Sequence, residues 1–263
     1  MLGTASSLRR TAPSVPAPIV ACRAIGKRFS NGTVALRDVD LDIHGQEFLS
    51  LLGPSGCGKS TLLRLIAGLG EPSSGAITWQ THDPTLSFVF QEPTLMPWAT
   101  ALANVVLPLK LAGVAHEERT QRATAALAQV GLGGFERAYP RELSGGMKMR
   151  VSIARALVTR PKVLLMDEPF AALDEITRFK LNNDLLELWR RESFTVVFVT
   201  HSVFESAFLS SRIAVMAARP GRVIEDIAVD APYPRDASYR TSPTYNEHCR
   251  RTSAALERAM AHG

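Results

Sequence analysis

A glycine-rich segment at residues 53–61 has the composition of a phosphate-binding loop. It fits the pattern G-x-x-x-x-G-K-[ST] and reads Gly53-Pro54-Ser55-Gly56-Cys57-Gly58-Lys59-Ser60-Thr61. The glycines allow successive backbone N–H groups to face phosphate oxygens, and a helix beginning here adds its dipole. Lys59 is then placed to reach the β- and γ-phosphates, and the Ser60 hydroxyl can bind Mg²⁺. Cys57 occupies a variable position, where we expect the backbone to bind.

A second group of candidate residues follows an apolar run. Residues 163–166 are all apolar and are followed directly by Asp167 and Glu168. A buried strand here places Asp167 at the carboxyl edge of the sheet, beside the phosphate loop, where it can hold Mg²⁺ and its waters. Glu168 is expected to point the other way along the pleat and to act as general base on an attacking water. The alternative is a surface acid at a strand end.

His201 comes at the end of the next predicted strand, residues 195–200. It should therefore emerge at the same sheet edge as Asp167, where it could contact the γ-phosphate. A single histidine is more often structural than catalytic, and the shared edge is what favours a functional role.

Residues 143–147 open another predicted helix. Ser144 can cap it, and Gly145 and Gly146 expose backbone N–H groups, so this is a second candidate phosphate site. Because one nucleotide already has a phosphate loop, two half-sites in one chain suggest head-to-tail pairing of two copies. The alternative is simply a capped helix.

The elements that must position these residues alternate between short β-rich runs and amphipathic stretches, which favours an α/β domain with a largely parallel sheet. Strands are predicted at residues 19–25, 36–43, 47–52, 76–79, 86–90, 162–166, 195–200, 212–216 and 222–228. Helices are predicted at residues 61–69, 101–111, 117–130, 146–159, 175–191 and 244–261. Residues 92–160 thus form a helical insertion.

Composition limits the function classes further. The chain has 263 residues, of which 46% are apolar, enough for a full core. Of its 30 basic residues, five lie within residues 1–28, which contain no acidic residue, so the rest of the chain is neutral overall. A broad nucleic-acid-binding face is therefore not expected.

The cysteines suggest a reducing compartment, and the sequence predicts no membrane-spanning helix. The three cysteines are too scattered for a disulfide framework, and the six histidines lack metal-ligand spacing. Arg9-Arg10 precedes a Pro-rich stretch rather than an apolar one, so we interpret residues 1–18 as a disordered basic tail and not as an export signal. No stretch approaches the 18 apolar residues that a membrane helix needs.

Taken together, these motifs resemble those of an ATP-binding cassette (ABC) ATPase over residues 19–229. The resemblance implies an α/β P-loop NTPase core with a mixed, largely parallel sheet, an N-terminal antiparallel β-subdomain and an inserted α-helical subdomain. It also implies ATP and Mg²⁺ as ligands. Residues 19–243 would form the ATPase domain, and residues 244–263 a helical appendage.

The resemblance also implies roles for further residues. Phe29 would stack on adenine, although a core aromatic is the alternative, and Gln91 would sense Mg²⁺ and the γ-phosphate. Ser144 and Gly146 would contact ATP bound to a second copy, and Asp174 would couple the two sites. Lys27 and Arg28 precede Phe29 and are expected near anionic nucleotide, unless they are a solvated strand end.

Two departures from the family pattern concern packing. Met147 stands where the family most often has glutamine, and Met149 follows Lys148, so altered packing near the ribose is expected while the backbone donors persist. Residues 76–90 are short for the family, which leaves the size of the antiparallel subdomain open.

Several segments look like those of the nitrate/sulfonate/taurine importer group: residues 90–98, 104–105, 170–174, 210–212 and 219–222. Residues 95–98, Leu-Met-Pro-Trp, are apolar for a surface loop and could dock a helix of a separate membrane permease or pack against the helical subdomain.

Our main hypothesis from the sequence is an ABC importer ATPase that forms a homodimer around two MgATP. It would lie on the cytoplasmic face of the inner membrane and drive a permease fed by a solute-binding protein. The alternatives are a soluble ABC-type ATP switch in DNA repair or translation, and the ATPase of an exporter or lipid transporter.

Overall fold

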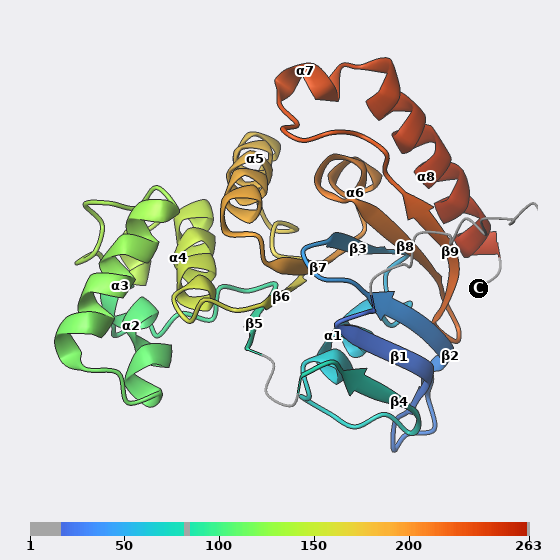
Figure 1. Cartoon of the computed structure of the whole chain (residues 1–263), viewed down its shortest axis with the longest axis horizontal. Helices are drawn as coiled ribbons and strands as arrows, with labels where there is room; N and C mark the ends of the chain where they lie inside the picture. The colour runs from blue at the N-terminus through green and yellow to red at the C-terminus, as the bar shows by residue number, and fades with distance from the viewer. Residues whose placement is uncertain (1–16, 82–84, 262–263) are drawn as a thin grey trace, which may run out of the picture.

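The computed structural model describes residues 17–81 and 85–261, so all but the last two residues of the predicted tail lie outside the described part. Its centre is a six-stranded sheet in the order β5-β6-β7-β3-β8-β9 (Figure 1). The strands are β3 (Phe48–Leu52), β5 (Leu86–Val89), β6 (Val163–Asp167), β7 (Thr195–Thr200), β8 (Arg212–Ala217) and β9 (Arg222–Ala228). All neighbours are parallel except β8 and β9, which confirms the mixed, largely parallel sheet.

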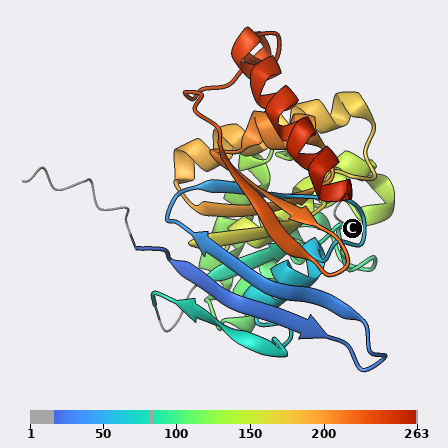
Figure 2. The same ribbon diagram turned by 90° about the vertical axis from the view of Figure 1, so that its right-hand side faces the viewer.

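A second sheet of three antiparallel strands, in the order β2-β1-β4, confirms the predicted N-terminal subdomain. Its strands are β1 (Val20–Arg28), β2 (Val34–Ile43) and β4 (Ser74–Trp79). Figure 2 shows this sheet on the opposite side of the main sheet from the C-terminal helix. Although residues 76–90 are few, β4 pairs with β1 from Val20 to Gly26, so the short segment still supplies a full edge strand.

The helical subdomain lies at one end of the main sheet, beside β5 (Figure 1). It contains α2 (Ala101–Leu111), α3 (His116–Gln129), the single 3₁₀ turn η1 (Pro140–Glu142) and α4 (Gly145–Leu157). The Thr100 side chain caps α2 by accepting a hydrogen bond from the backbone N–H of Ala103 at 3.2 Å, which ends the preceding loop.

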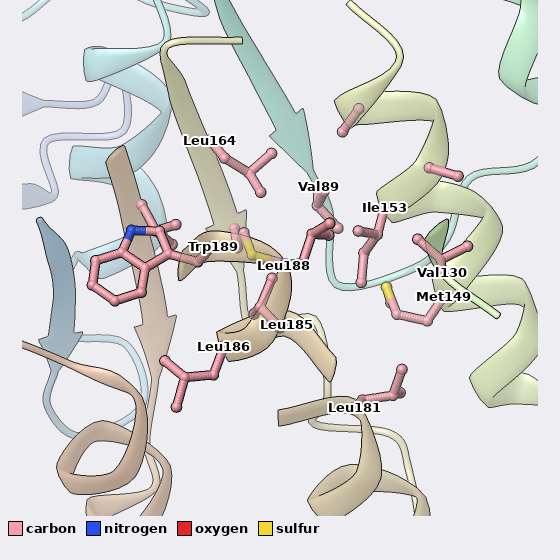
Figure 3. Close-up of a cluster of buried hydrophobic side chains, with 14 of the residues drawn as sticks. Val89, Val130, Met149, Ile153, Leu164, Leu181, Leu185, Leu186, Leu188 and Trp189 are labelled. Atoms are coloured by element: carbon pink, nitrogen blue, oxygen red, sulfur yellow. The ribbon is translucent and has the colours of Figure 1, made fainter. Parts of the chain in front are cut away.

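Both faces of the main sheet are covered, which explains the continuous apolar runs of its strands. Along β6, Leu164 and Met166 pack in the cluster that includes α5 (Glu175–Glu192), whereas Val163 and Leu165 face the cluster of α1 (Lys59–Ile66). Figure 3 shows α5 between β6 and α4, so one apolar cluster holds the helical subdomain against the core.

The C-terminal helix differs from the expected appendage. Helices α6 (Val203–Leu209), α7 (Ala237–Arg240) and α8 (Pro243–Ala261) follow β7, and α7 was not predicted. Ala255 and Ala259 of α8 are fully buried with Ile213 and Val215 of β8, because small side chains allow close approach to the sheet. The helix is therefore part of the core.

Within residues 17–81 and 85–261, no helix combines the length and hydropathy needed to cross a membrane.

Candidate nucleotide-binding and hydrolysis site

The glycine-rich loop joins β3 to α1, the position predicted from its pattern. Gly58 caps α1 with a φ of +97°, which favours glycine. A Cβ on Gly53 would lie 2.5 Å from the carbonyl oxygen of Met216 in β8, so this position has no room for a side chain. The backbone of the loop is thereby held close to the sheet while its outer side stays open.

Lys59 is buried inside the curve of this loop. Its Nζ donates hydrogen bonds to the carbonyl oxygens of Gly53 at 2.8 Å and Pro54 at 3.1 Å, and lies 3.8 Å from Glu168 Oε1. An ammonium group held at this point can exchange carbonyl partners for phosphate oxygens, which bind it more strongly because they are charged.

Ser60 and Asp167 meet across the loop, since the Ser60 hydroxyl donates to Asp167 Oδ1 at 2.6 Å. Burial raises the pKa of Asp167, and the hydrogen bond from Ser60 and the charges of Arg64 and Lys59 oppose that rise. A hydroxyl and a carboxylate side by side are oxygen ligands of the type that Mg²⁺ prefers. The predicted metal residues Ser60 and Asp167 therefore fit a magnesium ion.

Glu168 departs from the geometry that we predicted. It has a φ of +46°, in the left-handed region, so the pleat ends at Asp167 and the side chain does not simply point to the opposite face. Its backbone N–H donates to the carbonyl of Val199 at 3.1 Å, which holds the turn against β7. A non-glycine residue in this region costs about 1–3 kcal/mol, and such strain gathers at functional sites.

This turn places Glu168 between two other predicted site residues. Its Oε1 lies 3.8 Å from Lys59 Nζ, and its Oε2 lies 3.3 Å from Nδ1 of His201, which follows β7. The His201 side chain is 52% exposed, so its other ring nitrogen can face a ligand. Lys59, at the start of α1, thus converges with Glu168 and His201, which follow β6 and β7, at the carboxyl edge of the sheet.

Phe29 follows β1 and its side chain is 44% exposed, so the alternative of a core aromatic is wrong. The Nζ of Lys27 lies 5.8 Å from the centre of the Phe29 ring and donates to the carbonyl of Glu71 at 2.6 Å. Lys27 is thus next to the proposed adenine platform, whereas Arg28 uses its backbone N–H to bond Ser73 Oγ at 3.0 Å. Gln91 is exposed and follows β5, next to β6.

Ser144 belongs to a different part of the molecule. Its Oγ caps α4 by accepting a hydrogen bond from the backbone N–H of Met147 at 3.2 Å, and the side chain is exposed. Helix α4 belongs to the helical subdomain, to the left of α1 in Figure 1. The structure therefore does not bring Ser144, Gly145 and Gly146 together with Lys59 in one chain.

Asp174 lies beside this second half-site. It is exposed and caps α5, and the hydrogen bond from the Thr177 N–H at 2.9 Å lowers the pKa of its carboxyl. A Cβ on Gly146 would lie 2.6 Å from Thr177 Cγ2, so α4 and α5 approach closely where both begin.

Two residues that support the site were missed from the sequence. Arg155 of α4 donates to the carbonyl oxygens of Thr94 at 2.8 Å and Pro93 at 2.9 Å, and so ties the segment after Gln91 to the helical subdomain. A Cβ on Gly221 would lie 2.1 Å from the Cys57 carbonyl oxygen, so this turn supports the phosphate loop. Its Pro-Gly pair marks a turn but gives no sign of its neighbour, and nothing in the sequence marks Arg155.

Residues 36–171 match the family model described as ABC transporter. The chain belongs to this family. It is an ABC ATPase, and its relatives include import proteins. It is 44% identical to the aliphatic sulfonates import ATP-binding protein SsuB of Bacillus licheniformis, over 83% of this chain and 87% of that protein. It is also 44% identical to the nitrate import ATP-binding protein NrtD of a Synechocystis species, over 82% and 84%.

Solved structures support the same family. An ATP-binding cassette solved as a dimer in a post-hydrolysis state with ADP and Pi aligns with a TM-score of 0.71 at 34% identity, covering 81% of this ABC ATPase and all of that chain. The cbiO1 protein of Clostridium perfringens, part of an ABC transporter complex, aligns with a TM-score of 0.72 at 29% identity, covering 80% and 88%. The predicted resemblance to an ABC ATPase of the nitrate/sulfonate importer group is confirmed by these similarities.

Proposed function

We propose that this ABC ATPase powers a separate transmembrane permease of an importer, as a homodimer that encloses two MgATP. The observation that carries the hydrolytic part is the convergence of Lys59, Glu168 and His201 at one sheet edge, with Lys59 Nζ 3.8 Å and His201 Nδ1 3.3 Å from the two oxygens of Glu168.

In this proposal the chain's own residues bind ATP and move one proton. The phosphate loop N–H groups and Lys59 bind the β- and γ-phosphates, while Ser60 and Asp167 would hold Mg²⁺, whose charge would stabilise the phosphate oxygens. Glu168 accepts the proton of the attacking water as general base. His201 orients Glu168 through their contact and can donate to the γ-phosphate. Gln91, which follows β5, would sense Mg²⁺ and the γ-phosphate.

Two copies are needed because one chain carries two half-sites that do not meet. Ser144 and Gly145 are exposed at the start of α4 and Gly146 is buried behind them, and this helix start is separated from α1 in Figure 1. A head-to-tail pair would place this helix start over the ATP held by the partner's phosphate loop. Asp174, exposed beside it, would couple the two sites. The dimeric state of the ATP-binding cassette that aligns with this chain supports this arrangement.

The helical subdomain carries the surface that we assign to the permease. Leu95 packs on the main apolar cluster, but Trp98 is 77% exposed and Leu111, at the other end of α2, is 79% exposed. The segment 95–98 thus serves partly as packing and partly as an exposed apolar patch of the type found in interfaces. Through it the protein would sit on the cytoplasmic face of the inner membrane, supplied indirectly by a solute-binding protein.

The solute class follows from the relatives and not from the site. The import names of SsuB and NrtD, for aliphatic sulfonates and nitrate, favour a small solute of the nitrate or sulfonate type, within the importer group predicted from the sequence. Residues that bind ATP do not touch the solute, so the same site would serve an exporter or a soluble ATP switch. Fractionation separates these classes: an importer subunit co-purifies with membranes and its permease, whereas co-purification with DNA or ribosomes would contradict the proposal.

The experiment that tests the pairing is light scattering of the Glu168→Gln variant with and without ATP. The variant binds ATP but loses the general base, so we expect ATP to convert monomers to dimers. As a matched control, Glu168→Gln combined with Ser144→Arg should stay monomeric, because the added side chain blocks the second half-site. Dimers that form equally well with Ser144→Arg would overturn the head-to-tail arrangement.

A further inference from the structure

A partly buried ion pair connects two segments that flank the site. Nε of Arg178, in α5, lies 4.0 Å from Oε1 of Glu205, in α6. Both atoms are buried and neither has a hydrogen-bond partner among the described residues. A hydrogen bond between charged groups is about 2.7–2.9 Å long, so a shift of roughly 1 Å would satisfy both atoms at once.

Arg178 is attached to the segment of Asp174. Its guanidinium donates to the carbonyl oxygen of Leu173 at 2.9 Å, and its backbone N–H donates to the carbonyl of Asp174, also at 2.9 Å. Contact with a second copy would move this exposed segment. Because Arg178 is bonded to it, the guanidinium would move with it.

Glu205 is attached to the segment of His201. The hydroxyl of Thr200 donates to Glu205 Oε2 at 2.6 Å, and the backbone N–H of Ser202 donates to the same Thr200 hydroxyl at 3.0 Å. Thr200 and Ser202 are the two chain neighbours of His201. Glu205 thus fixes the backbone on both sides of the histidine that contacts Glu168.

We propose that Arg178 and Glu205 are positioning residues that transmit the position of the Asp174 segment to His201. Engagement of Asp174 by a second copy draws Arg178 onto Glu205, and the Thr200 hydroxyl carries that change to His201 and so to Glu168. The inference rests on the proposed dimer. Burial raises the pKa of Glu205, and the Thr200 hydroxyl, the charge of Arg178, the Asn182 side chain and the charge of His201 oppose that rise.

The test is a double-mutant cycle on ATP hydrolysis by the full chain. Glu205→Gln keeps the shape and an oxygen for Thr200 but loses the charge for Arg178, so we expect kcat about tenfold lower with little change in KM. In a His201→Ala background the same substitution should change the single-turnover rate less than about twofold, because its route to Glu168 is already lost. Arg178→Met should behave in the same way.

Glu47→Gln is the matched control. Glu47 pairs with Arg212 at 2.9 Å and its side chain is 11% exposed, against 10% for Glu205, but it lies at the other end of β3 from the phosphate loop. If Glu47→Gln only destabilises the fold, it should lower the melting temperature. It should then reduce the ATP hydrolysis rate by the same factor in the wild-type and His201→Ala backgrounds.

Two results overturn the inference: an unchanged kcat in Glu205→Gln, or an equal loss in both backgrounds for Glu205→Gln and Arg178→Met. If Glu205→Gln fails to fold, Arg178→Met alone decides by the same cycle. The proposed function fails separately, if His201→Ala and Glu168→Gln hydrolyse ATP at the wild-type rate.

Discussion

Glu168 and His201 come from the ends of adjacent parallel strands, and their side chains approach to 3.3 Å. The contact depends on the left-handed conformation of Glu168, whose N–H is held by the carbonyl of Val199. Glu168 therefore has Lys59 on one side and a half-exposed histidine on the other. This is the geometry on which we base the proposed role of Glu168 as proton acceptor.

Replacing Lys59 by alanine should weaken ATP binding by about 10- to 100-fold, since a hydrogen bond to a charged group contributes about 1.5–3 kcal/mol. Titration with a fluorescent ATP analogue measures this. Lys162→Ala, at the opposite end of β6, is the control and should bind normally. Equal affinity of the Lys59→Ala and wild-type proteins would remove Lys59 from the phosphate site.

Gly53→Ala should destabilise the protein by about 1–3 kcal/mol, because the new methyl group meets the Met216 carbonyl oxygen and the Cys57 sulfur. Urea unfolding gives the value. At Gly133 a Cβ meets nothing within 4 Å, so Gly133→Ala should be nearly neutral. Equal effects of the two substitutions would show that the close contact at Gly53 does not limit the side chain there.

Phe29→Ala should weaken ATP binding by about tenfold, from a base-stacking contribution of about 1–3 kcal/mol. Phe29→Tyr retains a ring and should bind like the wild type. Because Lys27 and Arg28 are close in sequence to Phe29, neutralising both should weaken binding at low salt and have less effect at high salt. If Phe29→Ala binds ATP normally, the ring does not stack on adenine.

Burial raises the pKa of the Cys22 thiol from its ordinary 9.0 to about 12. The unfolded chain then loses this proton near pH 9 while the folded chain keeps it, so the folded state binds more protons and its stability falls as pH rises. Between pH 9 and 10 the free energy of unfolding should fall more steeply in the wild type than in Cys22→Ala. Urea unfolding measures these free energies. The same slope against pH in both proteins would contradict this prediction.

The positions of the strands could be predicted well from the sequence, because a parallel sheet covered on both faces requires continuous apolar runs such as residues 163–166. Asp167 and His201 come at the ends of such runs, so their location at the same edge of the sheet followed from topology. The C-terminal helix was misinterpreted because the Pro-rich stretch before it resembles a linker, whereas Ala255 and Ala259 pack on β8.

Other features depend on contacts that no local pattern records. The left-handed turn at Glu168 arises from its bond to Val199 of the neighbouring strand, and Gly221 supports the phosphate loop only in the folded chain. The link from Arg178 to Glu205 joins two helices whose relative position is set by packing on the sheet. Such relationships require the tertiary structure.

The rate of phosphate release from ATP by Glu168→Gln decides whether Glu168 is the general base. We expect the wild type to hydrolyse MgATP and Glu168→Gln to be at least about 100-fold slower while still binding ATP, in line with the usual contribution of a general base. Glu192→Gln, at the far end of α5, should match the wild type. Hydrolysis by Glu168→Gln at the wild-type rate would rule out Glu168 as the general base.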